Sequence, residues 1–356
     1  MKKYLFIFLS LNLSFSQSQV FELLDSNQTG VEFNNLIEDK KEHNILLYAN
    51  YYGGGGVGIA DFDNDGLQDI YFGGNLVSDI IYRNLGDFKF EDKTINSGIN
   101  DNGSWSSGVT IADVNNDGLV DVYVSKELYD DEPELRRNKL YINKGNFIFE
   151  ESSKSWGVDV SARTRHAVFF DYNNDGHLDL YLLNQPPNPG SYSKFFGSDL
   201  TLPEYSLQLF RNTGSNNFID VTEEAGLKRT GFPNSVVASD LNNDGLVDLY
   251  VANDFEAPDF LYFNNGDGTF SYETESSLKH TSFYSMGVDS ADINNDGELD
   301  VMVVDMTAED NFRLKSNMSG MNPSAFWKVV EDGGHFQYMF NTLQINNGDK
   351  TFSDVA

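Results

Sequence analysis

The sequence predicts an all-β protein whose tandem four-stranded units are the blades of a β-propeller, and two observations lead to this fold class. The first is a nine-residue motif, D-x-(D/N)-x-D-G-x-x-D, whose copies start at Asp61, Asp113, Asp171, Asp240 and Asp292. The intervals between the copies are 52, 58, 69 and 52 residues, and periods of this size are typical of propellers and solenoids. The second is a constant order of short apolar and alternating stretches around each copy, which predicts four β-strands per unit.

The first two strands of a unit flank the motif. An apolar stretch precedes the motif and predicts the first strand, at Val57–Ala60, Val109–Ala112 and Val236–Ala238. An alternating stretch follows and predicts the second strand, at Asp69–Phe72, Asp121–Val124, Asp179–Leu182, Asp248–Val251 and Asp300–Val303. The motif is therefore expected to form the loop of the strand 1–2 hairpin.

The second half of each unit contains two further strands separated by a glycine turn. The third strand is predicted at Lys139–Asn143, Gln208–Asn212 and Phe260–Asn264. The fourth is predicted at Asn146–Glu150 and Asn217–Val221. Four-stranded units repeated in tandem are the blades of a propeller, and five units are visible.

The motif places oxygen atoms where a short loop can wrap a calcium ion. Side chains at loop positions 1, 3 and 5, such as Asp61, Asp63 and Asp65, can converge on one cation. Glycine at position 6 permits the left-handed backbone that a sharp turn needs. The carbonyl of position 7 then faces inward, and the Asp at position 9 closes the site, as in an EF-hand loop shortened at its C-terminal end.

These features predict about five Ca²⁺ sites. The absence of His and Cys side chains from the ligand set disfavours zinc and copper, and Mg²⁺ is the weaker alternative because it keeps several waters. Plain Asp-Asn-Gly turns are the other alternative, but they would not require the Asp at position 9. The predicted metal ligands are Asp61, Asp63, Asp65, Leu67, Asp69, Asp113, Asn115, Asp117, Leu119, Asp121, Asp171, Asn173, Asp175, His177, Asp179, Asp240, Asn242, Asp244, Leu246, Asp248, Asp292, Asn294, Asp296, Glu298 and Asp300.

With these motifs, the chain resembles the FG-GAP (VCBS-type) repeat family, whose blades are similar to the calcium-binding blades of integrin α-subunit propellers. Gly55–Gly66 (GGVGIADFDNDG) and Tyr262–Phe270 (YFNNGDGTF) carry the resemblance, which covers about residues 50–356. Within the family, the chain looks most similar to the exported bacterial branch related to the cartilage acidic protein (ASPIC/UnbV) family, although no ASPIC/UnbV domain is visible. The resemblance implies calcium in each loop and adds no site residue.

The N-terminus predicts export. Lys2 and Lys3 precede the apolar stretch Tyr4–Phe15, and Ser14–Ser16 provides small residues for cleavage, so residues 1–18 are expected to be a signal peptide. The apolar run is too short to be a stable membrane anchor. We therefore expect a secreted, periplasmic or cell-surface protein with no transmembrane segment after signal removal.

Composition limits the classes of partner and the means of stabilisation. The formal net charge is −31, and 16 of the 55 acidic residues are loop Asp, which argues against nucleic acid as a partner. The chain contains no Cys, so disulfides cannot stabilise an exported fold and metal ions are the candidate that remains. An aromatic content of 14% favours a packed core over disorder.

Two segments raise the question of ring closure. Residues 19–50 are expected to be a lead-in, in which Phe21–Val31 resembles the segment Phe90–Gly98 and could supply a ring-closing outer strand. The propeller itself is expected over residues 51–356. Its last unit is expected to be incomplete, because Thr351–Ala356 aligns with Asn217–Thr222 and the chain stops inside this fourth strand. A compact ring of five or six blades and a fragment of a seven-bladed ring are both open. The abrupt ending favours the fragment, since propellers close to remove open edges.

The connections between strands two and three should lie on the face opposite the loops. Long inserts occur in three of them, at Lys126–Asn138, Asn184–Ser206 and Met306–Asn341. Inserts gathered on one face often form a binding face, where aromatic rings would suit sugars or a protein partner. The alternative is that the rings pack the inserts onto the propeller. The rings in question belong to Tyr192, Phe195, Phe196, Tyr205, Phe326, Trp327, Phe336 and Tyr338.

We therefore expect a binding or adhesion module for an extracellular glycan or protein ligand, in which calcium is structural. An enzyme is not expected, because the sequence contains no G-x-S-x-G, H-E-x-x-H or phosphate-binding glycine loop. Two alternatives stay open. One is a polysaccharide-processing enzyme on a propeller scaffold, with Arg163, Arg165 and His166 as its candidate residues, and the other is a scaffold for a missing C-terminal ASPIC/UnbV domain.

Overall fold

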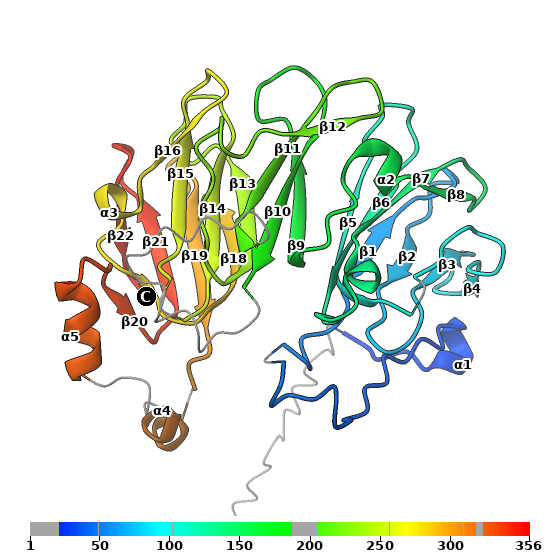
Figure 1. The fold of residues 1–356 in the computed structure, drawn as a ribbon, viewed down its shortest axis with the longest axis horizontal. Coiled ribbons are helices and arrows are strands. Elements are labelled where there is room, and N and C mark those ends of the chain that lie inside the picture. The colour runs from blue at the N-terminus through cyan, green and yellow to red at the C-terminus, as the bar shows by residue number, and fades with distance from the viewer. Residues whose placement is uncertain are drawn as a thin grey trace, which may run out of the picture.

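The computed structural model describes residues 21–48, 50–101, 103–186, 205–255, 257–308, 310–317 and 323–356 (Figure 1). The predicted signal peptide, residues 1–18, lies outside these residues, as do Tyr192, Phe195 and Phe196 of the second insert. Within the described ranges, no helix combines the length and apolar character needed to cross a membrane.

Five antiparallel sheets of four strands each make up the fold, and the strands of each sheet follow one another in chain order. The first two sheets are β1 (Val57–Ala60), β2 (Asp69–Phe72), β3 (Ile80–Asn84) and β4 (Phe90–Asp92), then β5 (Trp105–Ala112), β6 (Asp121–Glu127), β7 (Lys139–Asn143) and β8 (Phe149–Glu151). The third and fourth are β9 (Arg163–Phe170), β10 (Asp179–Gln185), β11 (Gln208–Asn212) and β12 (Phe218–Asp220), then β13 (Pro233–Ser239), β14 (Asp248–Asn253), β15 (Phe260–Asn264) and β16 (Phe270–Tyr272). The fifth is β18 (Ser285–Ala291), β19 (Asp300–Asp305), β21 (Thr342–Asn346) and β22 (Phe352–Asp354).

The predicted fold class, an all-β protein of four-stranded propeller-like blades, is confirmed. The fourth strands are shorter than predicted. In the second sheet the reason is that Asn146 and Phe147 adopt positive φ angles of 54° and 59° in the turn before β8. The fifth sheet has a three-residue fourth strand like the others.

The sheets stand side by side in an open arc. Their first strands, β1, β5, β9, β13 and β18, are successive neighbours, and Figure 1 places the first and fifth sheets at opposite ends of the row. This arrangement is consistent with part of a propeller.

The core lies between the faces of neighbouring sheets. A tyrosine at the same position of the second strand is fully buried in the first four sheets, as Tyr71, Tyr123, Tyr181 and Tyr250. Burial of one aromatic side chain stabilises a fold by roughly 1.5–3 kcal/mol, so each inter-sheet layer contributes to stability. The first sheet lies at the end of the row, and its outer face is less covered: Ile59 of β1 is 55% exposed.

The longest connection that the structure describes joins the second and third strands of the fifth sheet. It contains α4 (Asn311–Asn317), α5 (Pro323–Glu331) and β20 (Gln337–Tyr338), and β20 pairs in parallel with β17 (Thr281–Ser282). Two shorter helices, α2 (Ser153–Trp156) and α3 (Thr274–Ser277), follow fourth strands, and the 3₁₀ helix Pro133–Arg136 lies between β6 and β7. Both α4 and α5 lie on the lower side of Figure 1, the side on which the N-terminal segment runs.

The N-terminal lead-in repeats the connector that follows a fourth strand. The short helix α1 (Ser26–Thr29) ends at Gly30, where an added Cβ would lie 2.5 Å from the carbonyl oxygen of Phe90. In the next repeat, a Cβ on Gly98 would lie 2.1 Å from the carbonyl oxygen of Phe149, so both positions need glycine. Residues 21–25 form no strand here, and Phe21 is 87% exposed; the expected ring-closing strand is therefore not seen in the described chain.

Candidate metal-binding loops

The Asp at position 1 organises each loop by accepting two backbone hydrogen bonds. One carboxylate oxygen accepts from the N–H of position 5 at 3.0–3.1 Å. The other accepts from the glycine N–H of position 6 at 2.7–3.0 Å. The five glycines have φ between 84° and 95°, the left-handed conformation that favours glycine. The sequence prediction for position 6 is thereby confirmed.

Position 4 also adopts the left-handed conformation, which the sequence analysis did not predict. It is Asn in every loop, with φ between 56° and 60° in Asn64, Asn116, Asn174, Asn243 and Asn295. Asn tolerates this conformation better than other residues with a side chain. The Asn-Asp-Gly sequence therefore provides two left-handed residues around one Asp.

The Asp at position 5 and the residue at position 3 face the same side of the loop. One oxygen of the position 5 carboxylate accepts from the N–H of position 7 at 2.9–3.0 Å. In the second, third and fifth loops, the Asn at position 3 donates to the other oxygen at 2.8–3.0 Å. In the fourth loop, the side-chain oxygen of Asn242 is buried and has no hydrogen-bond partner, and an oxygen in this state is suited to a cation.

The Asp at position 9 lies beneath the loop and is at most 1% exposed in all five repeats. One of its oxygens accepts from the N–H of position 2 at 2.9–3.1 Å. The other accepts from the backbone N–H of an Asn at the end of the third strand at 2.8–2.9 Å. Burial raises the pKa of Asp69 to about 6 and those of Asp121, Asp179 and Asp248 to about 7, while these backbone hydrogen bonds lower them.

The Asn at the end of the third strand is a structural residue that the sequence analysis missed. Its side-chain amide donates to the carbonyl of position 8 in its own loop and to the carbonyl of position 2 in the preceding loop. The Asn212 amide, for example, lies 3.2 Å from the Leu178 oxygen and 2.9 Å from the Val114 oxygen. Asn143, Asn264 and Asn346 make the same pair of contacts. Each loop is thereby tied to the next blade, and the available signal was an Asn two residues before a glycine at the end of every third strand.

The first loop brings three carboxylates together. Atoms of Asp61, Asp63 and Asp65 lie within 4.8 Å of one another, whereas Asp69 is not part of this group. The Arg83 side chain, from the third strand, reaches the same carboxylates: its Nε lies 2.8 Å from Asp63 Oδ2 and its Nη2 2.9 Å from Asp65 Oδ2. No pattern in the sequence indicated this role for Arg83.

The donor set fits a calcium ion. Positions 1, 3 and 5 offer carboxylate and amide oxygens in every loop, and hard oxygen ligands around a flexible turn are what calcium prefers. The residue at position 7 donates its backbone N–H within the turn, and its carbonyl oxygen is the predicted metal ligand. These residues are Leu67, Leu119, His177, Leu246 and Glu298. Both carboxylate oxygens of the Asp at position 9 accept backbone hydrogen bonds, so this residue would stabilise the loop conformation.

Two of the three residues considered for catalysis are engaged in ion pairs. Arg163 pairs with Asp130 and lies 5.6 Å from the centre of the Tyr48 ring. Arg165 lies 3.5 Å from a carboxylate oxygen of Glu127, which is fully buried. Burial, and then the charge of Arg165, lowers the pKa of His166 to about 4. These contacts match a structural polar cluster at the strand edge.

A recess of about 520 Å³ opens beside this cluster, on the face opposite the loops. The N-terminal segment forms one wall and the connection after β6 forms the other. Tyr48 at its base is 5% exposed and donates a hydrogen bond to Glu127, and the His43 and Tyr129 rings meet edge to face at 5.4 Å. The lining residues are Glu42, His43, Leu47, Tyr48, Leu128, Tyr129, Asp130, Asp131, Glu132 and Arg163.

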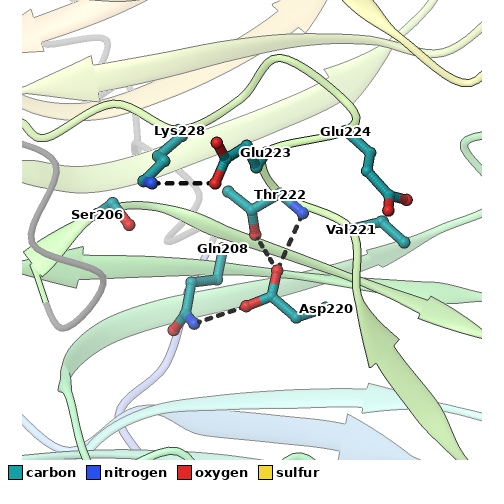
Figure 2. Close-up of a pocket in the computed structure, with 8 residues that line it drawn as sticks. All are labelled: Ser206, Gln208, Asp220, Val221, Thr222, Glu223, Glu224 and Lys228. Carbon is teal, nitrogen blue, oxygen red and sulfur yellow. Dashed lines mark hydrogen bonds and ion pairs between the residues drawn. The ribbon is translucent and has the colours of Figure 1, made fainter.

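A second, smaller hollow of about 240 Å³ lies at the outer edge of the third sheet (Figure 2). Its polar groups mostly satisfy one another. Lys228 pairs with Glu223 at 3.1 Å, and Asp220 accepts from Thr222 and from Gln208. Few donors or acceptors are left for a ligand, so the recess is the stronger binding candidate.

The aromatic side chains of the third insert mainly contact one another. Phe326 stacks on Tyr338 at 5.6 Å between ring centres and meets Trp327 edge to face at 5.3 Å. Trp327 is still 55% exposed and Phe336 37% exposed. The rings therefore pack the insert and also leave part of their surface open.

The family model that matches this chain describes an FG-GAP-like repeat. It matches residues 61–124, 131–182, 200–251 and 240–303. These ranges contain the loops described above and most of the strands around them.

Cartilage acidic protein 1 is similar in sequence. The human protein is 25% identical over 204 residues, which is 57% of this chain and 29% of the relative. The Xenopus tropicalis protein is 24% identical over 282 residues, or 74% of this chain and 42% of the relative. The chain thus spans less than half the length of these relatives.

Among solved structures, an Agrocybe aegerita lectin that recognises non-reducing terminal N-acetylglucosamine is similar at 18% identity and a TM-score of 0.46. The match covers 83% of this chain and 64% of the lectin.

Proposed function

Because the chain belongs to the FG-GAP-like repeat family, we propose that it is an exported calcium-binding propeller protein that binds an extracellular glycan or protein. Calcium has a structural role in this proposal. The observation that carries it is the fivefold repetition of one oxygen-rich loop, with the same hydrogen bonds each time.

The charge distribution supports the calcium part of the proposal. Each loop presents at least two carboxylates on its outer side, and the net charge of the whole chain is −31. Like charges held this close repel one another, and a divalent cation removes the repulsion while it fixes the hairpin. The buried Asn242 oxygen without a partner is the type of acceptor that such an ion would satisfy.

The recess on the face opposite the loops supports the binding part of the proposal. The recess combines partly buried aromatic rings with carboxylates, a set of groups that can stack on a ring and accept hydroxyl hydrogen bonds. No ion pair involves Glu42, Asp131 or Glu132 within the described chain. Binding is favoured over catalysis, because Arg163 and Arg165 already hold Asp130 and Glu127.

Two measurements on the full exported chain test this function. Equilibrium dialysis against calcium should show several ions bound per chain, and binding of fewer than one would reject the calcium role. In the second measurement, the chain should be retained on immobilised polysaccharides or extracellular matrix proteins and should release no small sugars from them. Release of sugars that depends on Arg163 and His166 would favour the enzyme alternative instead.

A further inference from the structure

The first loop differs from the other four at one ligand position and in one neighbour. Position 3 is Asp63 in the first loop and Asn in the others. The residue before the Asn that ends the third strand is Arg83 in the first repeat, and its counterparts in the other repeats are Ile142, Arg211, Phe263 and Ile345. An additional carboxylate therefore coincides with an arginine that can reach it.

The Arg83 guanidinium lies among the oxygens that a metal ion would use. Its Nε is 2.8 Å from Asp63 Oδ2, and its Nη2 donates to Asp65 Oδ2 at 2.9 Å. The Asp63 side chain is only 10% exposed, so this contact is less screened by water than a surface pair. The remaining oxygen, Asp63 Oδ1, is buried without a hydrogen-bond partner.

Arg211 provides an internal comparison. It occupies the same place in the third repeat, where position 3 is Asn173 and no additional carboxylate is present. Asn173 donates to Asp175 at 3.0 Å. Arg211 lies beside Tyr172 and interacts with that side chain. An arginine at this place thus enters the loop only where position 3 is a carboxylate.

We infer that Arg83 is a built-in counter-cation of the first loop, so that this loop binds calcium more weakly than the other four. The inference rests on the calcium role proposed above. At positions 1, 3 and 5, three carboxylates and one guanidinium give the first loop a charge of −2, the same as two carboxylates alone. A calcium ion must displace Arg83 before it can use Asp63 and Asp65, because two cations cannot share these oxygens without repulsion.

The same contact stabilises the first loop when calcium is absent. The guanidinium reduces the repulsion between Asp63 and Asp65 and joins the loop to β3. Among the described residues, no ion pair joins a cation to the carboxylates of the other four loops. The first blade should therefore keep its loop in chelator, while the other loops depend on the ion.

The test is a calcium titration of the full chain and of single variants, measured by isothermal titration calorimetry. The wild type should show four sites of similar affinity and one that is about tenfold weaker. D61N should remove the weak site, and D240N should remove one of the four stronger sites. R83Q should tighten the weak site by about tenfold, whereas the control R211Q should leave every affinity unchanged.

A second readout does not depend on calcium affinity. In EDTA, R83Q should melt at a lower temperature than R211Q, and saturating calcium should abolish the difference. Five equivalent sites in the wild type, unchanged in R83Q, would overturn the inference and leave the calcium function intact. No saturable calcium binding in either protein would reject both.

Discussion

The face that carries the loops and the face that carries the inserts are built in different ways. On the loop face, five hairpins repeat the same backbone hydrogen bonds to within a few tenths of an ångström. On the opposite face, one connection contains two helices and another is a 3₁₀ turn beside the recess. Repetition gives the loop face a shared structural role, and the proposed function assigns ligand recognition to the varied opposite face. Substitutions in the loops should therefore affect stability, and substitutions of exposed residues on the opposite face should affect binding.

The largest effect on stability is expected for D179A. Asp179 is fully buried and accepts from the N–H groups of Tyr172 and Asn212. Removal of the carboxylate leaves both donors buried without partners, and each such donor costs about 1–3 kcal/mol. We expect the free energy of unfolding to fall by about 3 kcal/mol or more in urea denaturation. The control is D267A at an exposed turn, and equal losses for the two variants would contradict the structural role of position 9.

A smaller loss is expected for N212A, because it removes the tie between two blades. The Asn212 side chain contacts Val114 and Leu178 and accepts from the N–H of Gly214. We expect a loss of about 2 kcal/mol. N84A is the matched control, since Asn84 contacts only its own loop through the Gln68 carbonyl and the following turn. Equal effects of the two substitutions in the same denaturation assay would show that the inter-blade contact contributes nothing.

A buried carboxyl on the insert side predicts a pH dependence. Burial raises the pKa of Asp259 to about 7, against hydrogen bonds from Asn253 and Tyr250 that lower it. A raised pKa means that the folded state binds the proton more tightly than the unfolded state. Stability should therefore fall as pH rises from about 4 to about 7, with a slope of about 1.4 kcal/mol per pH unit from this one group.

D259N should remove this contribution to the slope. Thermal and urea unfolding between pH 5 and 8, at constant calcium, would measure it. An identical pH dependence in wild type and variant would show that Asp259 does not titrate in this range.

The smallest effect on stability is expected for E132Q at the rim of the recess. Glu132 is exposed, and exposed substitutions usually change stability by less than about 0.5 kcal/mol. If the recess binds the ligand, E132Q should weaken retention on that ligand without a shift of the melting temperature. A large loss of stability would instead assign Glu132 to the structure and remove the contrast between the two faces.

The loop face was easier to predict from the sequence than the contacts between distant segments. The motif specified the hairpin loops because Asp at position 1 and glycine at position 6 act within a few residues of chain. The contact of Asn212 with Val114 joins residues 98 apart in sequence, so only the structure shows what that Asn does. The pairing of Arg83 with Asp63 likewise depends on the β2–β3 register.

The recess was not predicted. It forms where Tyr48 of the lead-in packs against Trp105, at 6.0 Å between ring centres, and no local pattern indicates that contact. The ring-closing strand expected within Phe21–Val31 is the opposite case, because the sequence pattern is present but the described chain forms no strand there.

The most direct test of the account is thermal unfolding of residues 20–356 across a calcium titration, with EDTA as baseline. Extracellular calcium modules have dissociation constants on the order of 10⁻⁴–10⁻³ M. At 1 mM calcium and the tighter value, each of the four stronger sites adds about 1.4 kcal/mol and the weaker first site adds about 0.4 kcal/mol, so five independent sites add about 6 kcal/mol. The account predicts one cooperative transition that rises by many degrees with calcium. A transition at the same temperature in EDTA and in 1 mM calcium would contradict it.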